Sequence, residues 1–94
     1  METKVDKILE DRGSVYGSYK EGCKFREEVM AVVDNRSPGP MHPIHRRYID
    51  DIVNKLSRVA VTPTHRDSWV DIAGYATLVV KELDNETKKP FRVN

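Results

Sequence analysis

Acidic and basic side chains at helical spacing are the part of this sequence that could do chemistry. Asp67 and Asp71 are four residues apart, so on a helix their carboxylates point the same way and could share a divalent cation. Lys55 and Arg58, three residues apart on an earlier segment, could receive phosphate oxygens. Because Mg²⁺ takes carboxylates and phosphates together, the four residues predict a magnesium and phosphate site in which the two aspartates are the metal ligands.

The same four side chains also allow a purely structural interpretation. If the helices that carry them are antiparallel neighbours across a turn at residues 62–63, the basic side chains come within reach of the acidic ones as interhelical salt bridges. Residue types alone favour this interpretation slightly. Asp51 and Lys55 stand in the acid-before-base order of an exposed helical ion pair, worth ~0.3 kcal/mol, so we expect this polar face to pair within its own helix.

Two glycines near the start of the chain, Gly13 and Gly17, bracket a serine and an aromatic residue, which is typical of a tight, structured turn. Arg12 and Tyr16 in this segment could contact a nucleotide, or could pin the first helix against the last, and we favour the pin. Tyr75 is a second candidate for contact with a base. The segment lacks the GxxxxGK[ST] pattern of a phosphate loop.

Hydrophobic periodicity predicts an all-α fold of three to four helices, antiparallel where the loops are short, with the last three helices forming the core. Broad apolar faces on so short a chain imply a homo-oligomer. We expect one helical domain over residues 1–84 and an extended or mobile tail over residues 85–94. The predicted helices lie at about residues 3–11, 19–33, 43–60 and 64–83.

Particular residues mark the predicted helix boundaries. Gly13 is expected to end the first helix, and the proline-rich segment at residues 34–40 to separate the second from the third. Thr64 and Asp67 fit a capping box at the start of the last helix. Gly74 in its interior costs roughly 1 kcal/mol relative to alanine, which indicates that another backbone or a ligand comes close there, helix packing being the favoured reason.

Composition limits the classes of function. The 94 residues are 38% hydrophobic and 33% charged, which is typical of a soluble domain. No run approaches the ~18 apolar residues of a membrane span, and the first residues lack an apolar signal core, so we expect a cytoplasmic protein. A formal net charge of +1, from 16 basic and 15 acidic residues, argues against nucleic acid as the partner.

Cysteine and histidine give little support for other chemistry. Cys23 is the sole cysteine, so the chain has no internal disulfide, and we interpret it as a small core residue. His42 and His45 are three residues apart, but no acidic or cysteine ligand stands at a suitable interval, so we interpret them, with His65, as surface histidines. No pairing of a nucleophile with a base can be identified from the sequence.

Three segments resemble a family of small, uncharacterised phage and prophage proteins. They are ILEDRGSVYG at residues 8–17, KLSR at residues 55–58 and HRDSWVDIAGYA at residues 65–76. The family's pattern is an RGxxYG turn, a K-[IL]-x-R segment and an HxDSWxDIAGYA helix, and the likeness covers residues 8–80. No activity is attached to that family. A phage-encoded protein would be expected in the host cytoplasm.

More distantly, the chain is similar to the all-α nucleoside triphosphate pyrophosphohydrolases of the MazG-like type. These proteins gather an ExxE pair and an ExxD pair around Mg²⁺ and work as dimers or tetramers. Asp71 and the apolar and aromatic residues after it resemble the end of the second pair, but Ser68 stands where its glutamate would be, and the chain has no ExxE. The missing carboxylates argue against hydrolysis more than they argue against nucleotide binding. The carboxylates that would have to substitute are those of Glu27 or Glu28, Asp51, Asp67 and Asp71.

Two hypotheses from different classes follow, and the sequence does not decide whether the protein is an enzyme. The first is a phage-type helical protein that binds a nucleotide or phosphate metabolite, with or without Mg²⁺-dependent hydrolysis to the monophosphate and pyrophosphate. The second is a non-enzymatic host-takeover or counter-defence protein that binds a host protein or sequesters a signalling nucleotide. In the first hypothesis, Asp67 and Asp71 bind the metal ion, and Arg12, Lys55 and Arg58 bind phosphate. Tyr16 or Tyr75 contacts the base of the nucleotide.

Overall fold

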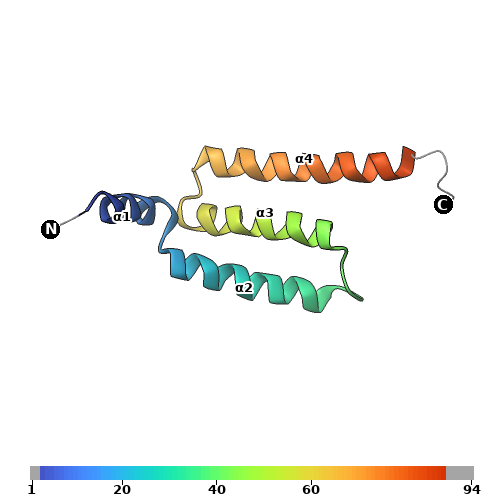
Figure 1. Cartoon of the computed structure of the whole chain (residues 1–94), viewed down its shortest axis with the longest axis horizontal. Coiled ribbons are helices and arrows are strands. Elements are labelled where there is room, and N and C mark those ends of the chain that lie inside the picture. Colours follow the sequence, from blue (N-terminus) through green and yellow to red (C-terminus); the bar gives the residue numbers. More distant parts are fainter. Residues whose placement is uncertain (1–2, 89–94) are drawn as a thin grey trace.

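Helices make up all the regular structure of the chain between residues 3 and 88, the part that the computed structural model describes (Figure 1). The all-α prediction is therefore confirmed for these residues. Within them, no helix combines the length and the apolar character that crossing a bilayer requires. The four helices are α1 (Lys4–Tyr16), α2 (Tyr19–Arg36), α3 (Pro43–Val61) and α4 (Arg66–Lys88).

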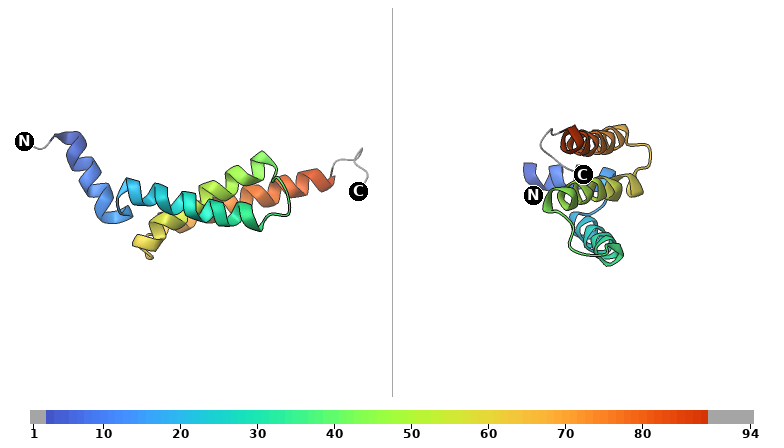
Figure 2. Two further views of the ribbon diagram at one scale, coloured as in Figure 1. Left: turned by 90° about the horizontal axis from the view of Figure 1, so that it is seen from below. Right: turned by 90° about the vertical axis from the view of Figure 1, so that its right-hand side faces the viewer.

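The helix α3 lies in the middle of the molecule, between α2 on one side and α4 on the other, and it runs antiparallel to both (Figure 1). The helices α1 and α2 follow the same general direction although only two residues separate them, so the prediction that short loops join antiparallel helices holds for α2, α3 and α4 but was wrong for α1. Within the described residues the backbones of α2 and α4 do not approach each other, so the three helices form a single layer (Figure 2). The radius of gyration is 17.2 Å, against ~12 Å for a compact domain of this length. The chain is elongated, and much of each helix lacks a neighbour.

The first helix begins where the sequence predicts and ends later. Thr3 is its N-cap: the Asp6 N–H donates to Thr3 Oγ1 (3.1 Å), and the Thr3 N–H donates to the Asp6 carboxylate (3.2 Å). The prediction that Gly13 ends the helix was wrong, because α1 continues through it to Tyr16. Gly17 ends it instead, with φ of 80° and its N–H donating to the Gly13 carbonyl (2.9 Å).

The C-terminal end of α1 is fastened to the turn between α3 and α4. The Thr62 hydroxyl donates a hydrogen bond to the Val15 carbonyl. A Cβ built on Gly17 would lie 3.0 Å from Val61 Cγ2, closer than a methyl group can sit without displacing it. Glycine is therefore required at residue 17 for its backbone conformation and for the close approach of Val61.

Three other predicted helix boundaries also differ from the structure. Helix α2 runs on to Arg36, so the separating segment begins at Ser37, three residues later than expected. Helix α4 begins at Arg66, which puts His65 at the N-cap position, and the predicted capping box between Thr64 and Asp67 does not form. Helix α4 also continues past residue 84 to Lys88, although hydrophobic periodicity stops at Leu83. Residues 89–94 of the predicted tail lie outside the described residues.

Few side chains are fully buried in this layer. The buried apolar residues are Met30 of α2 and Val53 and Val59 of α3. At the α2–α3 seam, a Cβ on Gly22 would lie 3.3 Å from the buried Ser57 hydroxyl, so the two helices come close there. The core therefore follows the two sides of α3 and does not form a closed interior.

Large apolar side chains remain exposed on every helix among the described residues. On α4 these include Trp69, Val80 and Leu83. Gly74 does not serve close packing within the chain, because a Cβ built there meets nothing within 4 Å. The reason predicted for this glycine, a neighbouring backbone or ligand, is wrong for the single chain.

The contrast between the two glycines of α1 gives a test of this fold. Replacing Gly17 with alanine should destabilise the docking of α1 by about 2 kcal/mol, because alanine is strained at φ of 80° and crowds Val61. Gly13→Ala should stabilise α1 by ~0.5 to 1 kcal/mol, because this position is helical and open. Urea unfolding together with amide hydrogen exchange in α1 would measure both. Equal effects of the two substitutions would contradict this account of how α1 ends.

Candidate functional site

The basic and acidic residues of α3 and α4 meet as predicted, through one particular pair. Lys55 Nζ lies 3.0 Å from Asp71 Oδ2. The lysine side chain is only 13% exposed and the aspartate 47%, so the ion pair closes one edge of the α3–α4 seam. The expected pairing of Asp51 with Lys55 along α3 was wrong: Asp51 instead lies 3.6 Å from Arg47 Nε. Lys55 thus crosses to α4 because its position on α3 faces that helix.

The two aspartates of the predicted metal site are placed differently. Asp67 is exposed in the first turn of α4 and has no ionic or hydrogen-bonded partner within residues 3–88, whereas Asp71 is held by Lys55. Across the same range no three His, Cys, Asp or Glu side chains come together in a way that could hold a metal ion. A Mg²⁺ ion at Asp67 and Asp71 would need further oxygen ligands from phosphate and water. The chain alone does not build this site, and Mg²⁺ stays a prediction.

A basic and aromatic cluster lies where α1, α3 and the start of α4 meet. The Arg58 guanidinium carbon is 4.5 Å from the centroid of the Tyr16 ring, a cation–π distance. The His65 ring meets Tyr16 edge-on, with centroids 5.2 Å apart and planes at 89°. Tyr16 thus pins α1 against α3 and the α3–α4 turn. The favoured interpretation had the pin but placed it against the last helix, which α1 does not approach within the described residues. Arg58 has no carboxylate partner in the described part of the chain, unlike Lys55 one turn before it.

Positive charge gathers around this cluster. Arg12 lies one turn before Tyr16 on α1, is exposed, and forms no ion pair with another described residue. Arg66 begins α4, whose N-terminal N–H groups also favour anions. We name Arg12, Tyr16, Arg58 and His65 the junction cluster. Tyr75 does not belong to it, because it lies ten residues after His65, about 15 Å along the helix axis.

A contact between His65 and Ser68 was not anticipated from the sequence. His65 Nδ1 and Ser68 Oγ share a hydrogen bond of 2.8 Å across the first turn of α4. Ser68 is only 1% exposed, so its hydroxyl cannot reach a substrate, and the pair links His65 to the first turn of α4 rather than forming a nucleophile with its base. The interval from His65 to Ser68, the same as in a capping box, was the signal that could have found it.

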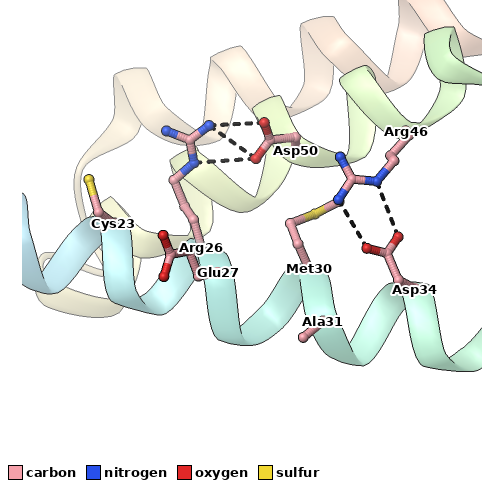
Figure 3. A pocket seen from close by; sticks show the side chains of 8 residues that line it. All are labelled: Cys23, Arg26, Glu27, Met30, Ala31, Asp34, Arg46 and Asp50. Carbon is pink, nitrogen blue, oxygen red and sulfur yellow. Dashed lines mark hydrogen bonds and ion pairs between the residues drawn. The ribbon is translucent and has the colours of Figure 1, made fainter.

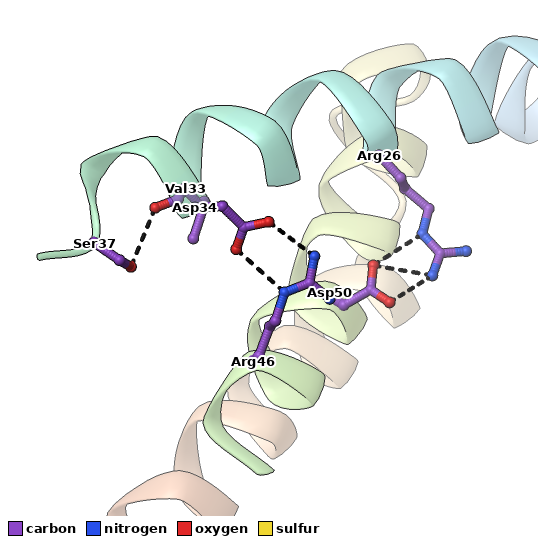
Figure 4. Close-up of polar contacts among 6 residues, drawn as sticks. All are labelled: Arg26, Val33, Asp34, Ser37, Arg46 and Asp50. Carbon is purple, nitrogen blue, oxygen red and sulfur yellow. Dashed lines mark hydrogen bonds and ion pairs between the residues drawn. The ribbon is translucent and has the colours of Figure 1, made fainter. Parts of the chain in front are cut away.

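A separate hollow of about 450 Å³ lies between α2 and α3 (Figure 3). Arg26 binds Asp50 through two contacts of 3.0 Å, and Arg46 binds Asp34 at 3.0 Å and 3.2 Å (Figure 4). Cys23, expected in the core, is half-buried at its edge. Because a carboxylate already engages each guanidinium, a phosphate in this hollow would have to displace an aspartate. The hollow is therefore a poorer anion site than the junction cluster.

Comparison with known proteins gives one match to a family model, over about a third of the chain, and no activity. Residues 51–83 match the model of a protein family described as a domain of unknown function (DUF6378). No curated protein and no solved structure matches the chain. The matched segment covers the second half of α3 and most of α4, so it contains the ion pair between Lys55 and Asp71, and Arg58 and His65 of the junction cluster.

The different surroundings of Asp67 and Asp71 can be tested by parallel substitutions. Asp71→Asn should lower the free energy of unfolding by about 1 to 2 kcal/mol, because it leaves the largely buried Lys55 ammonium without a counter-ion. Asp67→Asn should change it by no more than about 0.5 kcal/mol, because this carboxylate is exposed and unpaired among the described residues. Urea denaturation curves would compare them. Equal losses would contradict the structural role of the ion pair.

The ion pair at the hollow gives a prediction about pH. Hydrogen bonds from the Arg46 side chain, aided by its charge, hold the pKa of the Asp34 carboxyl below its ordinary value. A lowered pKa in the folded state stabilises the fold above the unfolded-state pKa, and this stabilisation is lost as pH falls through the folded-state pKa. Carboxyl NMR titration should show the depressed pKa, and Arg46→Gln should raise it. An unchanged pKa in that variant would contradict the assigned cause.

Proposed function

We propose that the protein binds a phosphate-bearing small molecule of the nucleotide class at the junction cluster. The observation that carries the proposal is the Arg58 guanidinium, which lies 4.5 Å from the Tyr16 ring centroid without a carboxylate partner in the described range. Stacking on an aromatic ring orients a guanidinium and leaves its N–H groups available for phosphate oxygens. Arg12, one turn before Tyr16 on α1, and His65, edge-on to the Tyr16 ring, supply further donors, and the start of α4 adds favourable N–H dipoles.

Binding without turnover is the form of the proposal that the geometry supports best. Hydrolysis of the MazG-like kind depends on several carboxylates around Mg²⁺, and here Lys55 already neutralises Asp71. The missing ExxE pair of the sequence agrees with this. The likeness to phage proteins supports a role in which the bound nucleotide is sequestered in the host cytoplasm, as in a counter-defence protein. In that role the ion pair of Lys55 and Asp71 holds α3 and α4 in register, and the junction cluster holds the ligand.

Calorimetric titration with inorganic pyrophosphate and with nucleoside mono-, di- and triphosphates would test the proposal. We expect binding that strengthens with phosphate number, and Arg58→Gln should weaken it about 10- to 100-fold, because charge-assisted hydrogen bonds are lost. Arg36→Gln is the matched control: it removes the same charge at the exposed end of α2, far from the junction cluster (Figure 1). The control should bind like the unchanged protein.

Two outcomes would count against this function. If no phosphate compound binds, or if Arg58→Gln binds as well as the control, the junction cluster only holds α1 in place and does not bind a ligand. Pyrophosphate release should be followed in the same samples with Mg²⁺ added. Release that is abolished by Asp67→Asn would replace the proposal of binding alone with the MazG-like hydrolysis that the sequence resemblance implies.

A further inference from the structure

Helix α4 carries a second apolar stripe that no part of the described chain covers. Its residues recur at steps of four, three, four and three, the spacing that keeps side chains along one seam between two helices. Trp69 is 48% exposed, Val80 55% and Leu83 44%, and the two alanines between them are exposed as well. We name this set the α4 stripe: Trp69, Ala73, Ala76, Val80 and Leu83.

The α4 stripe is distinct from the side of α4 that packs on α3. Four residues of α4 are less exposed than their neighbours, and each comes directly before a residue of the α4 stripe in the sequence. One residue along a helix is a rotation of about 100°, so these four residues face a different side of α4. Because α3 is the only helix of the described chain whose backbone lies beside α4, the adjacent side of α4 is open along its length (Figure 2). The α3-facing set, which contains none of the large exposed apolar residues of α4, is Ser68, Ile72, Tyr75 and Val79.

The surface area of the chain exceeds what a stable monomer of its size exposes. Its accessible surface is 7629 Å² for a mass of 10.8 kDa. Folded monomers of this mass expose about 5,500 Å², which leaves an excess of about 2,000 Å². A standard protein interface buries about 800 Å² on each partner. The excess over the whole chain is therefore larger than the area that one partner of a stable dimer buries.

We propose that a second copy of this chain docks along the α4 stripe, with the two α4 helices antiparallel and a two-fold axis beside Ala76. Ala76 is the midpoint between Trp69 and Leu83, seven residues from each. The two-fold axis then places Trp69 against Leu83 of the partner subunit, and each Ala76 against its own copy. A self-complementary patch of this kind closes as a dimer and does not propagate into a filament.

Side-chain size and charge select the antiparallel arrangement. Small residues at the centre let the two backbones approach, and the large residues fill the space at either end. A parallel pair would bring the two Arg66 guanidinium groups together, since Arg66 continues the stripe by one step toward the start of α4. It would also align the two helix dipoles in the same direction, which is unfavourable, whereas the antiparallel pair opposes them.

Sedimentation equilibrium of the full chain over a range of concentrations tests the interface. The unchanged protein should dimerise, and Ala76→Glu should weaken the dimer about 100-fold or more, because it places two carboxylates on the two-fold axis in an apolar seam. Gly74→Glu is the matched control, with the same charge on the other side of α4, where a Cβ meets nothing within 4 Å. Circular dichroism should show the helical monomer retained in both variants.

The results that would overturn the proposal are distinct. A protein that stays monomeric at all concentrations, or a dimer that survives Ala76→Glu as well as Gly74→Glu, rules out the α4 stripe as the interface. Neither result bears on ligand binding at the junction cluster, since titration with pyrophosphate measures that separately. If the protein stays monomeric, the α4 stripe does not bind a second copy of the chain.

Disulfide cross-linking distinguishes the two orientations. In a Cys23→Ser background, Ala76→Cys should cross-link readily on mild oxidation, because residue 76 faces its own copy. Leu83→Cys should not cross-link, because in the antiparallel pair the two copies of residue 83 lie at opposite ends, roughly 20 Å apart along the helix axes. Rapid cross-linking through residue 83 would overturn the antiparallel arrangement.

Discussion

The position of α3 between α2 and α4 is the constraint on which the rest of the structure depends. Since the outer helices do not meet, each is held by one side only, and the buried apolar residues follow the two sides of α3. Charged side chains mark both seams: Arg26 with Asp50 on one, and Lys55 with Asp71 on the other. Each pair joins residues whose mutual distance depends on how far one helix slides along its neighbour, so the ion pairs help to fix register where apolar burial is limited.

The same layer separates the two regions that could bind ligands. The junction cluster lies where α1 meets the α3–α4 turn, and its arginine stacks on an aromatic ring. The hollow between α2 and α3 has two arginines, but both are engaged by aspartates from the facing helix. The two regions thus resemble each other in composition and differ in which charges remain available. This difference is the reason to place an anion at the cluster.

The sequence was sufficient for an all-α fold of three to four helices, for the antiparallel order of α2, α3 and α4 and for the meeting of Lys55 with Asp71, because these follow from periodicity and from turns that contain proline. It was not sufficient to tell Gly13 from Gly17, since the choice depends on contacts of Val61 and Thr62, far along the chain. It also did not separate the side of α4 that packs on α3 from the exposed apolar side next to it. Two apolar stripes lie side by side on that helix, and the one containing Ser68 packs on α3, although the other has the larger side chains. The junction between Tyr16, Arg58 and His65 likewise joins segments whose spacing in sequence carries no signal.

The attachment of α1 at one end has a consequence for its motion. The bond from Thr62 to the Val15 carbonyl and the stacking of Arg58 on Tyr16 both act on the last turn of this helix, whereas Val5, Ile8 and Leu9 near its start are exposed. Amide protection in α1 should therefore decline steadily from its C-terminal turn toward Thr3, with the first turns opening and closing while the last stays formed. We therefore expect this helix to move as an arm whose fixed end is the contact of Tyr16 with Arg58.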